Sequence, residues 1–176
     1  MRSTRTNKIL KQKQKNEKMK KLITICLLLA TTYSVKAQQK PTKEATVTFI
    51  KNQLASMIGT KWIYDNLITK YSFETEKIYF EASGEMVTTT YTYSQLNWVN
   101  YVGNSRAGND IILAFKSAVK EDYKAFAKNG AVVNSGVKNN QSIQIPLPSE
   151  KFDSLSKAFL RLSEIAKEEN KDPFQN

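Results

Sequence analysis

Two segments place an apolar side chain at every third or fourth position, which is the period of an α-helix with one buried face. The first covers residues 43–58, between Thr42, a residue type that caps helix N-termini, and Gly59, a residue type that ends helices. The second begins after Ser149, another capping residue type, and runs to residue 169. The apolar stripes are Val47, Ile50, Leu54 and Met57 in the first segment and Phe152, Leu155, Phe159, Leu162 and Ile165 in the second. We predict an amphipathic helix in each segment.

Between these helices the apolar period falls to two, which is typical of strands with one buried face. The predicted strands are residues 77–82, 85–93, 110–116 and 141–147. The pair Ser83-Gly84 fits a two-residue hairpin turn between the first two strands. Residues 95–101 either continue the second strand or bend away from it, and residues 103–108 read as a polar loop.

Two stretches fit more than one structure. Residues 60–70 suit a loop, a short helix or a first strand. Residues 117–140 suit either a helix, through Val119, Tyr123 and Phe126, or an extension of the preceding strand. Their second part, from Gly130, is small and polar and suits a loop or a weak hairpin.

Helix, sheet and helix together predict one α+β domain over residues 42–169. The sheet is largely antiparallel, with about five to seven strands, and its face is the surface that can bury both apolar stripes. Residues 38–41 are a linker before this domain, and residues 170–176 are a polar tail after it.

Several short strands followed by one C-terminal amphipathic helix resemble the pleckstrin-homology-like superfold. The segments that carry the resemblance are residues 77–82, 85–101, 110–116, 142–147 and 152–165. The resemblance implies a small barrel closed by the last helix. The basic phosphoinositide-binding pattern of that family is absent, and Phe159 is the nearest aromatic residue to the tryptophan often seen in its last helix. No phosphoinositide site is therefore transferred to any residue, and a cystatin-like fold that begins with a helix is the alternative.

The first 37 residues have the pattern of an export leader. Lys20 and Lys21 precede an apolar run over residues 22–30, which is long enough for a signal peptide and too short to span a membrane. Small or modest side chains before Gln38 suit a signal peptidase, so we predict cleavage between Ala37 and Gln38. The expected product is periplasmic or extracellular, with no stable membrane anchor.

Residues 1–18 are polar and basic and allow two interpretations. They are either an unusually long beginning of the leader or a stretch upstream of a true start at Met19. We favour the second, because residues 19–37 already contain every part of a signal peptide.

Removal of the leader changes the charge of the protein. The whole chain has 27 Lys and Arg against 16 Asp and Glu, a formal charge of +11 that suggests a nucleic-acid partner. Residues 1–37 hold ten of the basic residues and one acid, which leaves 17 basic and 15 acidic residues. A nearly neutral protein lacks the electrostatic pattern of nucleic-acid binding, so we predict no such partner.

The chain contains no histidine, and its single cysteine, Cys26, lies in the leader. Histidine- and cysteine-based catalysis and zinc sites are therefore excluded from the mature protein. Two S-x-x-K matches, at residues 117–120 and 154–157, lack the companion motifs of Ser-Lys enzymes. Four glutamates are the candidates for a pair of glycosidase carboxyls, but they occur at positions typical of a solvated strand face: Glu74, Glu76, Glu81 and Glu85. We predict no catalytic residue, cofactor or metal.

Aromatic side chains cluster in the middle of the chain. Tyr91, Tyr93, Trp98 and Tyr101 follow Trp62, Tyr64 and Tyr71. Tyrosine and tryptophan combine a large apolar area with a polar tip, so the first four are a tentative ligand face, and the alternative is that they fill the core. The expected function is a small exported non-enzymatic domain that binds a protein, a peptide or an apolar ligand. The alternatives are a hydrolase using paired carboxylates or a Ser-Lys dyad, and an envelope accessory protein without a ligand of its own.

Overall fold

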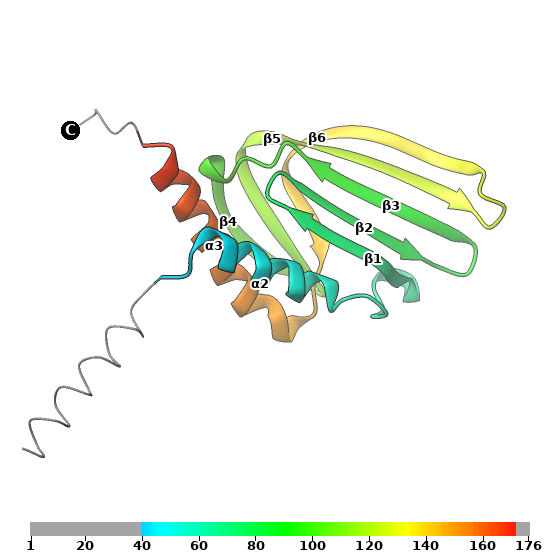
Figure 1. Ribbon diagram of the computed structural model, residues 1–176. Coiled ribbons are helices and arrows are strands. Elements are labelled where there is room, and N and C mark those ends of the chain that lie inside the picture. Colours follow the sequence, from blue (N-terminus) through cyan, green and yellow to red (C-terminus); the bar gives the residue numbers. More distant parts are fainter. Residues whose placement is uncertain (1–39, 172–176) are drawn as a thin grey trace, which may run out of the picture. The chain divides into compact units, whose positions relative to one another are not determined.

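The computed structural model describes residues 40–171 (Figure 1). The predicted leader, the cleavage site between Ala37 and Gln38, and residues 38–39 and 172–176 lie outside the described residues. The main elements are α2 (Lys43–Ala55), β1 (Leu67–Glu74), β2 (Lys77–Ser83), β3 (Val87–Ser94), β4 (Tyr101–Ala107), β5 (Asp110–Ala127), β6 (Val132–Pro146) and α3 (Phe152–Glu169). Short 3-10 helices occur at Ile63–Asp65, Trp98–Asn100 and Ser149–Lys151.

The six strands form one antiparallel sheet in the order β1-β2-β3-β5-β4, with β6 paired to β5. The long strand β5 joins two parts of this sheet, because its first half pairs with β4 and its second half with β3. Strand β6 follows β5 along both parts. The predicted α+β fold with a largely antiparallel sheet is confirmed. The sheet is not a closed barrel, so a pleckstrin-homology-like barrel is not confirmed and the resemblance stays a prediction.

A bulge in β5 separates the two parts of the sheet. Ala114 pairs with Ser142 and Val119 pairs with Asn140, so four residues of β5 stand opposite Gln141 alone. The Gln141 side-chain amide donates a hydrogen bond to the Lys116 carbonyl, 3.1 Å away, and so satisfies one backbone group that the bulge removes from the ladder. Residues 117–140 therefore extend the sheet, and the helix considered for them is wrong.

The two helices lie side by side and bury their apolar stripes against the sheet (Figure 1). Helix α2 packs on β1, and α3 packs on β4 and on the 3-10 helix Trp98–Asn100. Ile50 of α2, Phe80 of β2 and Phe159 of α3 are fully buried. Burial of each such side chain stabilises the fold by about 1.5–3 kcal/mol, so this layer is the main source of stability.

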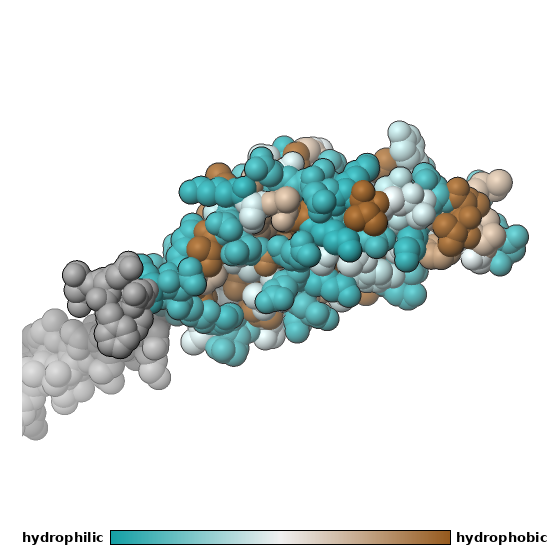
Figure 2. Space-filling view, turned by 90° about the horizontal axis from the view of Figure 1, so that it is seen from above, coloured by the Kyte–Doolittle hydropathy of each residue, from teal (hydrophilic) through white to brown (hydrophobic). Residues whose placement is uncertain are grey.

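The far ends of β3, β5 and β6 extend beyond the helices (Figure 1). Figure 2 shows apolar groups at this end of the molecule, at the right of the view. The side chains of Met86, Val132 and Val133 are each more than half exposed. This part of the sheet is in contact with solvent on both faces, which explains why β6 carries polar and small residues over most of its length.

Two local predictions are wrong. The β2–β3 turn is centred on Glu85 and Met86, not on Ser83-Gly84, because the Gly84 amide donates to the Val87 carbonyl, 2.9 Å away, and the ladder still pairs Ser83 with Thr88. Residues 103–108, expected as a loop, fall mostly in strand β4. Strand β4 is an edge strand with an outer face in solvent, so polar side chains suit it. Because these side chains interrupt the apolar period, the sequence pattern does not indicate a strand there.

The helix boundaries also differ slightly from the prediction. Helix α2 ends at Ala55, and residues 56–59 form turns that end at Gly59, whose φ of 87° lies in the left-handed region. Helix α3 begins at Phe152 and not after Ser149, because Ser149–Lys151 is a separate 3-10 helix with no side-chain cap. Such tightening of a first turn is common at helix ends.

Candidate functional site

A cleft of about 330 Å³ opens where the 3-10 helix Ile63–Asp65 meets the sheet. It lies beside the bulge of β5, so the irregular part of the sheet borders it. Its lining consists of Trp62, Ile63, Tyr91, Tyr93, Ile112, Glu121, Ser142, Ile143 and Gln144. Most of this surface is apolar or aromatic, with a few polar groups, which is the usual composition of a small-molecule site.

A strained turn holds one wall of the cleft. Tyr64 and Asp65 have φ angles of 54° and 60°, in the left-handed region that residues with a side chain rarely adopt. The turn is closed by the Trp62 amide, which donates to the Asn66 carbonyl at 2.7 Å. Two such residues in a row cost about 1–3 kcal/mol each, and strain of this kind is concentrated at functional sites.

Three aromatic rings form the corner of the cleft. The Trp62 ring stands edge-on to Phe80, with 5.3 Å between centroids, and edge-on to Tyr91, with 5.7 Å. Tyr91 in turn stacks on Phe80 at 4.8 Å. Phe80 is fully buried, so it fixes the positions of two rings that are only partly buried and border open space.

A buried carboxylate lies behind this corner. Asp110, the first residue of β5, is 5 % exposed. Its Oδ1 accepts a hydrogen bond from Trp62 Nε1 and its Oδ2 accepts one from Gln144 Nε2, each at 2.6 Å. The Tyr93 hydroxyl donates to the Gln144 carbonyl at 2.9 Å. These bonds join the turn, β3, β5 and β6 at one point.

A second carboxylate lies on the cleft lining. Glu121 of β5 is partly exposed, and its Oε2 accepts a hydrogen bond from Asn140 Nδ2 at 2.7 Å. In residues 40–171 no lysine or arginine forms an ion pair with Glu121 or with Asp110. Lys138 stands opposite Glu121 in the ladder, but its ammonium lies over the Tyr123 ring, 5.3 Å from the centroid.

The tyrosines around the cleft are held in their neutral form. Burial raises the pKa of Tyr93, and the negative charges of Glu121 and Asp110 raise it further. Burial also raises the pKa of Tyr91, again with a contribution from Glu121. Burial, followed by the effects of Tyr93 and Asp110, raises the pKa of Tyr71 well above its ordinary value. The Tyr71 hydroxyl is buried and has no hydrogen-bond partner in the described part of the chain.

The four residues of the tentative ligand face do not share one surface. Tyr91 and Tyr93 line the cleft. Trp98 is 3 % exposed and stacks on Phe159 of α3, with 5.5 Å between nearly parallel rings. Tyr101 is also buried, at 5.4 Å from the Trp98 ring. The structure therefore places the first two beside open space and the other two in the core.

Sequence reasoning did not select Asp110, Glu121 or Gln144 for this site. Asp110 does carry a signal, because an acidic residue directly before the apolar run Ile111–Phe115 is a charged group at the edge of a buried strand. Glu121 and Gln144 carry no such signal in the sequence, because polar residues at alternate positions occur on any partly exposed strand. The regular ladder of β5 and β6 places Gln144 beside Asp110, while Glu121 lies beyond the bulge of β5.

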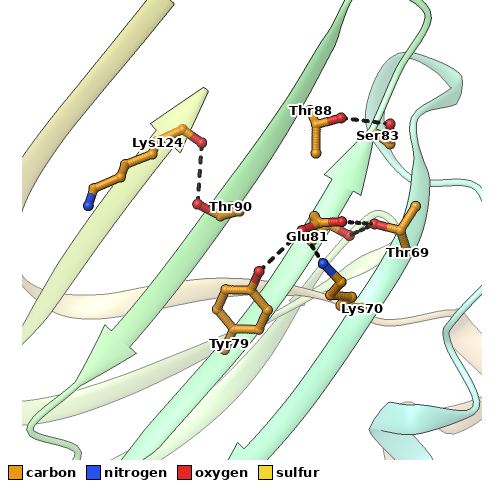
Figure 3. A network of polar contacts seen from close by, with 8 residues as sticks. All are labelled: Thr69, Lys70, Tyr79, Glu81, Ser83, Thr88, Thr90 and Lys124. Carbon is orange, nitrogen blue, oxygen red and sulfur yellow. Dashed lines mark hydrogen bonds and ion pairs between the residues drawn. The ribbon is translucent and has the colours of Figure 1, made fainter. Parts of the chain in front are cut away.

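The glutamates considered for catalysis lie elsewhere. Glu81 accepts hydrogen bonds from Thr69 and Lys70, and a longer one of 3.3 Å from the Tyr79 hydroxyl (Figure 3). This network lies on the face of β2 opposite Phe80, away from the helices. Within the described ranges no three residues of the His, Cys, Asp and Glu types are grouped so that they could hold a metal ion. Residues 40–171 also include no helix that is long and apolar enough to cross a membrane.

Comparison of the chain with protein-family models, with curated proteins and with solved structures finds no match.

Proposed function

We propose that this chain is exported and works as a non-enzymatic domain that binds a small organic ligand in the cleft beside Trp62. The observation that carries the proposal is the corner of Trp62 and Tyr91, which borders open space and is fixed from behind by the buried Phe80. A rigid aromatic wall of this kind binds a ligand without first losing side-chain freedom, which favours affinity.

The polar groups of the cleft favour binding over turnover. Both carboxylates accept hydrogen bonds from neutral side-chain amides or from an indole, so neighbouring side chains hold their orientation. The chain has no histidine to act as a base near neutral pH, and its cysteine belongs to the predicted leader. A hydrolase based on paired carboxylates remains the alternative, and turnover of any ligand found would favour it.

The test is a thermal-shift screen of the purified protein against four chemical classes: amines, sugars, aromatic acids and fatty acids. A ligand at a hundredfold excess over its Kd adds about 2.7 kcal/mol to stability and should raise the unfolding midpoint by about 5 °C or more. The variant Ser142→Trp fills the cleft mouth and should lose this shift. The variant Ser135→Trp places the same side chain elsewhere on β6, outside the cleft, and should keep it. A shift that survives in Ser142→Trp, or no shift with any class, would overturn the proposal.

Export is tested separately, by N-terminal sequencing of the protein from its natural host. The proposal requires a first residue at Gln38, in material outside the cytoplasm. A first residue at Met1 or Met19 in cytoplasmic material contradicts the export part of the proposal and leaves ligand binding to be judged by the screen.

A further inference from the structure

We propose that the ligand of the cleft is an organic ammonium ion, held between the rings of Trp62 and Tyr91 and the carboxylate of Glu121, with the buried Asp110 carboxylate behind them. This inference rests on the proposed function and adds the chemical class of the ligand. Four observations carry it: uncompensated negative charge, the arrangement of the rings, a buried hydroxyl without a partner, and the size of the cleft.

The first observation is the charge. Asp110 is almost fully buried, and its hydrogen bonds come from Trp62 and Gln144, which are neutral. Buried charges in proteins are normally paired with an opposite charge, and no described lysine or arginine is paired with this one. Glu121 adds a second negative charge, and unlike Asp110 it lies on the cleft lining itself. A cation in the cleft would supply the missing opposite charge.

The second observation is the arrangement of rings. Trp62 and Tyr91 stand at 88° to one another, and both rings belong to residues that line the cleft. The face of an aromatic ring is electronegative and attracts cations, and tryptophan does so most strongly. The protein already uses this interaction nearby, because the Lys138 ammonium lies over Tyr123 and not beside Glu121, its partner in the ladder.

The third observation is the Tyr71 hydroxyl. It is buried without a hydrogen-bond partner, and the Tyr71 ring stacks at 5.5 Å on Phe80, the ring behind the aromatic corner. A buried hydroxyl without a partner is destabilising. The Asp110 carboxylate and the Tyr71 hydroxyl therefore make the region behind the aromatic corner polar, although neither lines the cleft, and the negative charge there favours a cation in front of it.

The fourth observation is size. The volume of about 330 Å³ is at the lower end of the range for small-molecule sites, about 300–1,000 Å³. A single ammonium group with a short organic part fits this space better than a peptide or a lipid chain. The wall at Ile63 and Ile112 offers apolar contact for that organic part.

The test compares choline with dimethylbutanol, its neutral isostere in which carbon replaces the nitrogen. Binding is followed by NMR through the indole N–H signals. The chain has two tryptophans, so Trp62 reports on the cleft and Trp98, which is buried under α3, is an internal control. We expect choline to shift the Trp62 signal and not the Trp98 signal, with an affinity about tenfold or more above that of dimethylbutanol.

Two neighbouring residues of β5 provide matched variants. Glu121→Gln removes a negative charge from the cleft, and Asp122→Asn removes one from the opposite face of the same strand. We expect Glu121→Gln to weaken choline binding several-fold and Asp122→Asn to leave it unchanged. Because Glu121 is partly exposed, the variant is expected to fold, and an unchanged position of the Trp98 signal verifies this.

The outcomes separate this inference from the proposed function. If choline and dimethylbutanol bind equally, or if both variants behave alike, the cationic ligand is wrong while the cleft remains a binding site. If neither probe moves the Trp62 signal, but a ligand of another class that the thermal-shift screen identifies does move it, the cationic ligand is also wrong. If no compound moves that signal, the proposed function fails as well.

Discussion

The two tryptophans of this protein have opposite surroundings. Trp98 lies in a dry cluster under α3, stacked on Phe159 and in contact with Phe73, and its Nε1 donates to the Thr75 carbonyl at 2.5 Å. Trp62 lies at the edge of a second cluster, against Phe80 and Tyr91, and its Nε1 donates to a carboxylate. Trp98 is only 3 % exposed, whereas Trp62 is partly exposed and lines the cleft.

The two clusters differ in how they contribute to the stability of the domain. In the Trp98 cluster every ring is buried and the polar tip is satisfied by a backbone group, so the arrangement serves the fold. The Trp62 cluster includes a strained turn, a buried carboxylate and an unpaired hydroxyl. These features cost stability, and proteins retain such features mainly where a ligand is bound.

The largest effect should come from truncation in the dry cluster. Trp98→Ala removes a fully packed indole and should lower the free energy of unfolding by about 3–5 kcal/mol. Urea denaturation followed by circular dichroism measures the loss. Tyr64→Ala is the control, because the Tyr64 side chain is 93 % exposed and its removal should change stability by less than about 0.5 kcal/mol. A loss below about 1 kcal/mol in Trp98→Ala would contradict the assignment of Trp98 to the core.

A smaller effect is expected at the other tryptophan. Trp62→Phe keeps an aromatic ring but removes the indole N–H that donates to Asp110, so the buried carboxylate loses one of its two side-chain donors. A hydrogen bond to a charged group contributes about 1.5–3 kcal/mol, and we expect a loss in that range at neutral pH. We expect the double variant Trp62→Phe with Asp110→Asn to lose less free energy of unfolding than the sum of the losses in the two single variants. Additive losses would mean that the indole and the carboxylate act independently.

The sequence predicts the dry region far better than the cleft. Both helices, strand β2 and the start of β5 follow from apolar periods, because each has one face in the core. Strand β3 is also predicted, although Tyr93 is its one buried residue. The second half of β5 and most of β6 have no buried face, so nothing in their pattern distinguishes them from a loop. The cleft depends on the bulge between Ala114 and Val119, which groups residues that are far apart in the chain. No periodic pattern encodes such an irregularity.

Alkaline pH should reveal the buried tyrosines of the dry cluster. Burial raises the pKa of Tyr101 to about 12, against an ordinary value of 10.0, and the hydrogen bond from Asn104 lowers it slightly. Above pH 10 the unfolded chain loses this proton while the folded chain keeps it, so stability falls between pH 10 and about 12 and levels off beyond. The contribution is about 1.4 kcal/mol per pH unit in that window. Urea denaturation should show a shallower alkaline decline in Tyr101→Phe than in the wild type, whereas equal declines would contradict the burial of this hydroxyl.

The smallest effect is expected on the solvent face of the sheet, at Glu81 (Figure 3). Partial burial tends to raise the pKa of this carboxyl, but hydrogen bonds from Thr69 and Lys70 and the charge of Lys70 together lower it below its ordinary value of 4.5. A depressed pKa in the folded state stabilises the protein above pH 4.5, and this contribution is lost as the pH falls through the folded value. Because the network is open to solvent, Glu81→Gln should cost below about 1 kcal/mol at neutral pH and remove part of the acid decline. Glu85→Gln, in the exposed β2–β3 turn, should leave that decline unchanged. If Glu81→Gln lowers the free energy of unfolding as much as Trp62→Phe does, the exposed carboxylate stabilises the fold as much as the buried one. The contrast between the two tryptophan clusters would then not distinguish a binding site from a stabilising core.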